Sequence, residues 1–381
     1  MPGSIWPVYN VLYILGAGFS APLGLPVISN FLFMARDMME LEPKRYQYFR
    51  SVLDQARSLS TAKNYLSADL FNIEHVLSII EMRSHTRNEK LPKEFIRFLA
   101  DVVEYYTPNE PMSSLGPIAL PQNRNDLCAV SAIDHPLWSA YISFLACAFC
   151  LEVWNTETDG KGKSAQAIYP DSHYKYGFLS LNYDEVLEKS LSFIQKWPGM
   201  DHCPPYYISS GRSGSYLKDV NKVSLAKLHG TVTKRRIVAP TWNKTHDTGT
   251  RKVWALAEEQ LKRATFIRFL GYSLPESDSY FQYLLAAALT DNEALRGIDV
   301  VCLDPDGAVR SRYERIISFR PLNFVSANLT EYLSLIKDGF TGAVDLARDN
   351  RRMDTDMERG HREFLRHHGV SETVPFQPMN H

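Results

Sequence analysis

The sequence has few cysteines and no marked excess of either charge. Its 381 residues include five cysteines, 42 lysines and arginines, and 43 aspartates and glutamates, which gives a formal net charge of -1. A small, odd number of cysteines excludes a disulfide scaffold and is typical of a reduced, cytoplasmic setting. A near-neutral chain carries no strong field for polyanions, so charge alone does not predict direct nucleic-acid binding.

Segments for secretion, membrane insertion and zinc binding are also missing. The start, "MPGSIWPVYN", lacks the basic residues and apolar core of a signal peptide. The apolar run "YISFLACAFCLEVW" is too short for a good membrane span. Cys147 and Cys150 have CxxC spacing, but no second pair or histidine cluster completes a zinc site. We therefore expect no membrane association and no metal.

Short apolar runs alternate with helical periodicity along much of the chain. The first run, "VYNVLYIL", covers residues 8–15, and five more follow at 176–184, 223–230, 265–273, 299–306 and 322–328. Helical segments lie between several of them, for example at 184–197 and 278–289. This alternation predicts an α/β fold, in which a Rossmann-like parallel sheet is covered by helices on both faces.

The sheet pattern is interrupted by a long helical block. Residues 31–154 contain five segments with apolar residues at three- and four-residue spacing, which predicts a large inserted all-helical module. We expect a split Rossmann-like domain at 1–30 and 166–345 and a helical insertion at 31–165. The charged residues 346–381 are expected to form a peripheral helix or a partly disordered arm.

Polar and glycine residues follow the predicted strands. Ligands of parallel sheets bind at the carboxyl ends of the strands, so these positions are the candidate site. They are Gly16 to Ser20, Asn182 to Asp184, His229, Gly271 to Ser273 and Asp304. Each has an ordinary structural alternative: "GAGFSA" is either a phosphate-binding turn or a plain one, Asn182 can cap a helix, and His229 can be a core residue.

Four of these motifs together resemble a known family. "GAGFSAPLGLP", "LSLNYD", "KLHG" and "FLGYSLPESD" stand in the order typical of the sirtuin (silent information regulator) family. The resemblance covers residues 8–30 and 170–330 and is closest to the bacterial branch of NAD-cleaving sirtuin-like proteins, in particular the sirtuin-like subunit of Sir/HerA-type anti-phage defence systems. It implies that NAD is bound as a substrate.

The resemblance also implies roles for individual residues. Asn182 would orient an attacking water beside the nicotinamide ribose, Asp184 would hold the nicotinamide carboxamide, and His229 would be the base near the ribose hydroxyls. The residues implied to bind the rest of the dinucleotide are Gly16, Ala17, Gly18, Phe19 and Ser20 at the pyrophosphate, Gly271 and Ser273 on the adenosine side, and Asp304 at the adenosine ribose.

The chemistry suits these residue types. Cleavage between ribose C1′ and nicotinamide passes through an oxocarbenium-like centre, and the leaving group is already cationic, so no strong general acid is needed. A histidine can accept a proton at cytosolic pH. The chain departs from the family in lacking its zinc module, and Val27, Ile28 and Ser29 replace an Asp-Phe-Arg run. The predicted nucleophile is therefore water, and the predicted activity is NAD+ glycohydrolase.

Other functions stay open at this stage. The same pocket would suit an NAD-dependent protein deacylase, an ADP-ribosyltransferase or a non-catalytic sensor of NAD or ADP-ribose. A dehydrogenase would need an acid at a second strand end, whereas Asp37 and Glu40 lie in a helical pattern. The resemblance further implies a ring-like homo-oligomer and a HerA-type hexameric DNA-translocating ATPase as partner, and the apolar-rich helical block is the expected interface.

Overall fold

A parallel sheet of seven strands forms the centre of the protein, with the strand order β11-β10-β9-β1-β4-β6-β5. The computed structural model describes residues 8–60, 72–87, 93–109, 137–149, 152–157, 163–168, 173–195, 207–209, 223–232, 236–237, 248–317, 321–342 and 355–370. The strands are β1 (Tyr9–Leu15), β4 (Tyr174–Ser180), β5 (Tyr207–Ser209), β6 (Ser224–Lys227), β9 (Phe266–Leu270), β10 (Gly297–Val301) and β11 (Leu322–Val325). The predicted fold class is confirmed.

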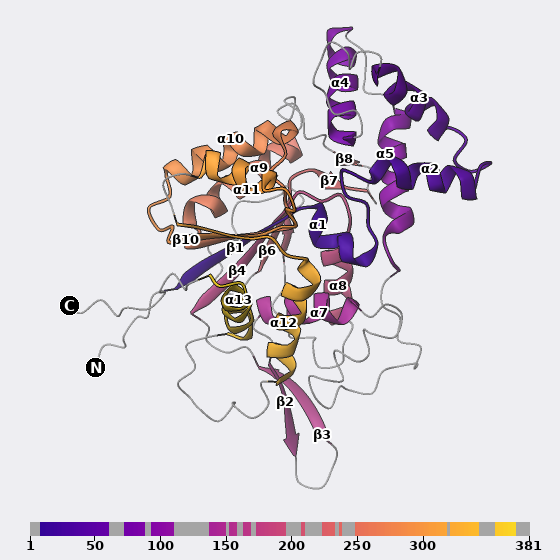
Figure 1. Ribbon diagram of the computed structural model, residues 1–381. Coiled ribbons are helices and arrows are strands. Elements are labelled where there is room, and N and C mark those ends of the chain that lie inside the picture. The colour runs from indigo at the N-terminus through magenta and orange to yellow at the C-terminus, as the bar shows by residue number, and fades with distance from the viewer. Residues whose placement is uncertain are drawn as a thin grey trace.

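Helices cover both faces of this sheet (Figure 1). Along β1, Val11 and Tyr13 belong to one core, while Leu12 and Ile14 belong to the other. A strand buried on both sides reads as a continuous apolar run, which explains the pattern of "VYNVLYIL". One face carries α9 (Thr248–Arg263), α10 (Ser279–Thr290) and α11 (Ala308–Ile316), and the other carries α7 (Trp138–Ala148), α8 (Val186–Gln195), α12 (Leu329–Gly342) and α13 (Asp356–His367).

The first helices after β1 form a group beside the sheet (Figure 1). They follow a short turn made of α1 (Ala17–Ser20) and η1 (Ala21–Leu23). Aromatic side chains join them: the Phe98 ring centroid lies 4.6 Å from that of Phe49 and 6.0 Å from that of Phe31. The members of this group agree with the predicted helical segments and are α2 (Phe31–Leu41), α3 (Phe49–Ser60), α4 (Ile73–Thr86) and α5 (Lys93–Tyr106).

The last helix of the predicted helical block, which we expected to continue to Trp154, ends earlier than predicted. α7 stops at Ala148, and β2 (Glu152–Glu157) pairs antiparallel with β3 (Lys163–Ile168). β-branched and aromatic residues in "EVWNTE" favour an extended strand over a helix. The inserted module is therefore not all-helical. A second small pair joins β7 (Gly230–Thr231) and β8 (Arg236–Ile237). Cys150 lies outside the described residues.

The charged C-terminal segment contains a helix, one of the two forms expected, but this helix, α13, belongs to the core and is not peripheral. Glu358 on α13 accepts two hydrogen bonds from Arg268 on β9, with nitrogen–oxygen distances of 2.8 and 2.6 Å. His361 Nε2 lies 3.0 Å from Asp299 Oδ2 on β10. All four side chains are buried. Pairing with charges on the strands is what allows this polar helix to pack against the sheet.

In the described part of the chain, no helix has both the length and the apolar character needed to cross a membrane.

Candidate functional site

The carboxyl ends of β1, β4 and β9 border a cavity of about 750 Å³. β1 lies between β4 and β9, and the chain leaves it in one direction and returns on its other side. Such a reversal of strand order opens a crevice where α/β proteins bind ligands, and the volume suits a ligand pocket. The predicted residues that border the cavity are Gly16, Ala17, Gly18, Asn182, Asp184, His229, Gly271 and Ser273.

Gly16 and Gly271 are glycines because the backbone segments around the turn pack too closely to leave room for a Cβ atom. A Cβ on Gly16 would lie 2.5 Å from Tyr272 Cα, and one on Gly271, where φ is +64°, would lie 2.2 Å from Phe19 N. The Gly16 and Gly18 amides donate to Leu270 O and Gly271 O at 3.1 and 2.9 Å. Two strand ends are thus joined through glycine backbone. Among the described residues the Ala17 amide has no protein acceptor, so it is the amide available to an anion.

Phe19 and Ser20 support this turn from behind. The Phe19 ring centroid lies 5.1 Å from that of Tyr141, whose hydroxyl donates to the Phe19 carbonyl. The Ser20 hydroxyl accepts from Asn182 Nδ2 at 3.3 Å. Both residues are buried, and neither borders the cavity. They hold the glycine turn in place rather than facing a ligand.

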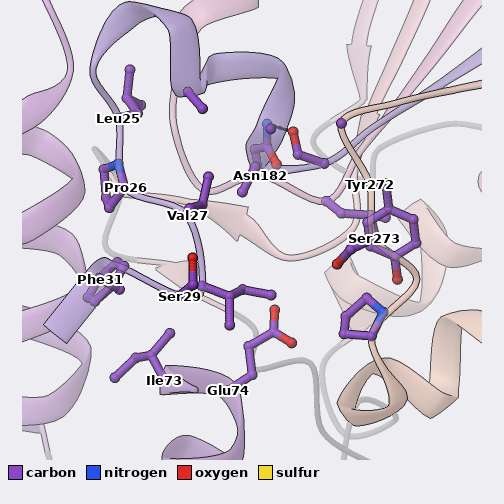
Figure 2. Close-up of a pocket in the computed structure, with 18 of the residues that line it drawn as sticks. Leu25, Pro26, Val27, Ser29, Phe31, Ile73, Glu74, Asn182, Tyr272 and Ser273 are labelled. Carbon is purple, nitrogen blue, oxygen red and sulfur yellow. Dashed lines mark hydrogen bonds between the residues drawn. The ribbon is translucent and has the colours of Figure 1, made fainter. Parts of the chain in front are cut away.

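Asn182 ties the end of β4 to the turn after β1. Its Nδ2 donates to Gly16 O at 2.8 Å and to Ser20 Oγ at 3.3 Å. No protein donor bonds its Oδ1 among the described residues, and the side chain borders the cavity beside the glycine turn (Figure 2). The Asn182 amide nitrogen therefore stabilises the turn, while its Oδ1 can accept a hydrogen bond from a water or a ligand.

Asp184 lies two residues before helix α8. Its Oδ1 accepts from the Val186 amide at 3.1 Å, at the start of α8. Its carbonyl accepts from Lys227 Nζ, which also pairs with Glu188 at 3.0 Å. The capping role considered for Asn182 thus belongs to Asp184. Since Asp184 is 8% exposed and borders the cavity, it can also meet a ligand there.

His229 borders the cavity with both ring nitrogens facing protein oxygens. Nδ1 lies 3.0 Å from the Leu181 carbonyl oxygen. A carbonyl oxygen can only accept, so Nδ1 carries a proton and Nε2 is the basic atom of the neutral ring. Nε2 lies 3.4 Å from Oδ2 of Asp278, a carboxylate that the sequence did not single out.

Asp304 does not border the cavity. Its Oδ1 and Oδ2 each accept at 2.9 Å, from the Val309 and Arg310 amides at the start of α11. Burial alone would raise the pKa of the Asp304 carboxyl, but these two amides outweigh it and lower the pKa. Both oxygens are occupied by the fold, so the structure gives no support for a ribose contact.

A positively charged side chain, that of Arg312, forms part of the cavity wall near Ser273. Arg312 on α11 borders the cavity, and its Nε donates to Ser273 O at 3.0 Å. No ion pair joins Arg312 to a carboxylate within the part of the chain that the structure describes. The guanidinium keeps further donors for an anionic ligand. Sequence reasoning missed it because one arginine in a helical pattern carries no signal.

Helix α4 forms the opposite wall. Ile73 and Glu74 lie across the cavity from Asn182 (Figure 2). Ser277 Oγ, in η4 (Glu276–Asp278), donates to Glu74 Oε2 at 2.5 Å, so the helical module is joined to the sheet at the site. Val27, Ile28 and Ser29, which replace the family's Asp-Phe-Arg run, also border the cavity. No spacing in the sequence indicates that α4 reaches the strand ends.

Within the described residues, no group of three or more histidine, cysteine, aspartate or glutamate side chains is arranged to hold a metal ion. No protein-family model matches the chain, and no curated protein matches it. The case for a function therefore rests on the residues that meet at this cavity and on the motifs that place them there.

Proposed function

We propose that the protein is an NAD+ glycohydrolase that uses water to release nicotinamide and ADP-ribose. One observation carries the proposal: the Asn182 amide oxygen, which no donor among the described residues bonds, and a histidine, His229, border the same cavity at a strand crossover. An amide that orients water beside a base is the arrangement that hydrolysis of an N-glycosidic bond requires. The identity of the dinucleotide comes from the sirtuin resemblance.

In the proposed reaction, Asn182 Oδ1 accepts from a water and aims its oxygen at ribose C1′. The bond between C1′ and the pyridinium nitrogen breaks, and its electron pair neutralises the leaving nicotinamide. The new bond forms between C1′ and the water oxygen, and the released proton passes to the base of the site, the role that the sirtuin resemblance implies for His229. Arg312 and Ala17 border the cavity, where the guanidinium can neutralise pyrophosphate charge and the Ala17 amide can donate a hydrogen bond to it.

Apolar side chains form part of the cavity wall, and we expect them to limit the access of bulk water to this reaction. Leu25, Val27, Phe31 and Ile73 line the side of the cavity away from Tyr272 and Ser273 (Figure 2). Apolar surroundings strengthen the electrostatic interactions beside them. We expect this wall to favour a single positioned water over bulk solvent.

Product analysis tests the proposal. The purified full chain is incubated with NAD+ in water enriched in oxygen-18, and the products are separated and weighed by mass spectrometry. We expect nicotinamide and an ADP-ribose that carries one heavy oxygen. Transfer of ADP-ribose to a protein or acyl group would indicate a transferase or deacylase. Binding of NAD+ without cleavage, measured by calorimetry, would indicate a sensor.

The quaternary state is a separate proposal that rests on the resemblance. We propose a homo-oligomer that associates with a HerA-type hexameric ATPase in anti-phage defence. Phe33 and Leu41 on α2, which are 51% and 70% exposed, support an interface on the helical block. We expect light scattering to give a mass of several chains and the ATPase to change the rate of NAD+ cleavage. A monodisperse monomer with the same rate with and without the ATPase would contradict this.

A further inference from the structure

The first residue of the motif "KLHG" is a buried lysine beside the site. Lys227 is the last residue of β6, is 7% exposed and does not border the cavity. Its Nζ donates to the Asp184 carbonyl and lies 3.0 Å from Glu188 Oε1 on α8. One ammonium group on β6 therefore contacts both the turn after β4 and the helix that follows this turn.

The turn between β4 and α8 is joined to the end of β6 at several further points. Three carbonyl groups at 180–183 face donors at 228–232, and the pairs are Leu228 N with Ser180 O at 2.9 Å, His229 Nδ1 with Leu181 O at 3.0 Å and Val232 N with Tyr183 O at 3.2 Å. No backbone amide among the described residues donates to the Asp184 carbonyl, which accepts from Lys227. The end of the turn thus depends on a side chain.

This turn carries two polar side chains of the site. Asn182 and Asp184 both border the cavity. Asn182 is also bonded to the turn after β1, through Gly16 O, whereas the Asp184 carboxylate bonds only the start of its own helix, at the Val186 amide. A shift of about 1 Å in a group that meets the reacting atoms can lower a rate by about 10²-fold. The bond from Lys227 to Asp184 is therefore placed where a small displacement matters.

We propose that Lys227 is a positioning residue that acts through the turn of Asn182 and Asp184. Its ammonium group holds this turn in the conformation in which both side chains meet a ligand in the cavity. The inference rests on the proposed NAD+ glycohydrolase function, in which these two side chains act at the nicotinamide end of the dinucleotide. Lys227 itself touches no substrate and transfers no proton.

The two contacts of the Lys227 ammonium group have different consequences. The ion pair with Glu188 joins β6 to α8 and compensates a buried charge. The hydrogen bond to the Asp184 carbonyl fixes the turn. A substitution of Glu188 removes only the ion pair, whereas a substitution of Lys227 removes both contacts. A comparison of the two substitutions therefore separates support of the fold from positioning of the site.

Hydrogen exchange tests the positioning without requiring activity. Glu188→Gln is the matched control, because Lys227 can still donate to the Asp184 carbonyl. Lys227→Met/Glu188→Gln leaves no buried charge uncompensated but removes the Nζ donor. Exchange of backbone amides at 181–187 is followed by mass spectrometry in the full chain. We expect it to be about 10-fold faster in the double variant than in Glu188→Gln, because the turn opens locally, and we expect the same rates in β1.

Kinetics and ligand binding link the turn to the reaction. We expect nicotinamide release from NAD+ to be about 10²-fold slower in Lys227→Met/Glu188→Gln than in Glu188→Gln. The affinity for ADP-ribose, measured by calorimetry, should be the same in both variants, because ADP-ribose lacks the nicotinamide group that this turn meets. A loss of rate with a retained affinity distinguishes positioning from a general collapse of the cavity.

The outcomes separate the inference from the function on which it rests. Equal exchange rates at 181–187 in the two variants, or equal and measurable rates of nicotinamide release, would overturn the inference. If Lys227→Met/Glu188→Gln does not fold, Lys227→Gln/Glu188→Gln gives the same comparison, and equal exchange rates there would overturn it. Faster exchange of the turn in a chain that cleaves no NAD+ would refute the proposed function and not the role of Lys227 in holding the turn.

Discussion

At the scale of single residues, the predicted site residues differ in whether their polar atoms are already hydrogen-bonded within the fold or can still bond a ligand. Asn182 uses its amide nitrogen for the fold but keeps its oxygen for the cavity. Asp304 has both oxygens bonded to the backbone of α11, and Ser20 does not border the cavity. A strand-end position therefore does not by itself give a residue a role at the site, because its polar atoms can already be bonded within the fold.

The two residues at the centre of the proposed reaction can be tested directly. We expect His229→Ala and Asn182→Ala each to lower nicotinamide release by about 10²- to 10⁴-fold, because one removes the base and the other the oxygen that orients water. Turnover is measured by chromatography on variants whose folding is checked by circular dichroism. His367→Ala, an exposed histidine on α13, serves as control. Near wild-type turnover in either site variant would refute that residue's role.

Arg312 predicts how the cavity recognises an anion. Arg312→Glu should weaken ADP-ribose binding by about 10- to 100-fold, since a charge-assisted hydrogen bond contributes about 1.5–3 kcal/mol and the new carboxylate repels phosphate. Calorimetry gives the affinity. Arg310→Glu is the matched control, because Arg310 lies on the same helix but is exposed and pairs with Glu314. Equal affinity losses in both variants would indicate a general charge effect and not a site contact.

At the scale of elements, α13 shows how a highly charged helix becomes part of a core. Glu358 and His361 point to the sheet, where Arg268 and Asp299 meet them. Gly360 lets the helix approach α12 closely, since a Cβ there would lie 2.9 Å from Ile336 Cα. Arg366 and His367, at the end of the same helix, are exposed. The element is held by a few paired charges and one close contact.

Removal of one partner of the buried pair of Glu358 and Arg268 should lower the stability of the protein. Glu358→Gln leaves the Arg268 guanidinium buried without its counter-charge, so we expect a loss of about 3–5 kcal/mol in the free energy of unfolding. Urea denaturation followed by circular dichroism measures it. Glu314→Gln, which breaks an exposed pair on α11, should change stability by less than about 1 kcal/mol. A comparable loss in both variants would contradict the assigned role of α13.

At the scale of the whole molecule, one sheet separates two hydrophobic cores, and the cavity opens where both meet the helical module. The core that contains Leu12 and Ile14 is closed by α9, α10 and α11. The core that contains Val11 and Tyr13 extends through α7 and α12 to the helical block. Because α13 is joined to the sheet by ionisable groups, the stability of the whole molecule should depend on pH.

That dependence has a definite sign. Burial and the charge of Arg268 lower the pKa of His361 below its ordinary value of 6.5, so the unfolded state binds its proton first as pH falls. Burial alone would raise the pKa values of Glu358 and Asp299, but Arg268 and His361 lower them below 4.5 and 3.8. Stability should therefore be full above about pH 7 and fall in two stages, first below pH 6.5 and then below pH 4.5. Urea midpoints across pH measure it, and constant stability down to pH 5 would contradict the buried neutral His361.

Much of the fold could be predicted from the sequence. The apolar runs of β1, β4, β6, β9, β10 and β11 predicted their strands, because strands buried on both faces leave little room for polar residues. The helical spacing of α2 to α5 also predicted those elements. The hairpin after α7 was missed because apolar residues continue from the helix into the strand. Short edge strand β5 was missed for lack of an apolar run.

The sequence by itself determined which polar residues stand at strand ends, and the parallel topology then brought Asn182, His229 and the glycine turn to one cavity. Only the tertiary structure decided which of their atoms remain available, because hydrogen-bond partners such as Gly16 O for Asn182 come from distant parts of the chain. It also decided that α4, Arg312 and Asp278 reach the site. Their positions depend on how helices pack against strand ends, and the local spacing of residues along the chain does not encode that packing.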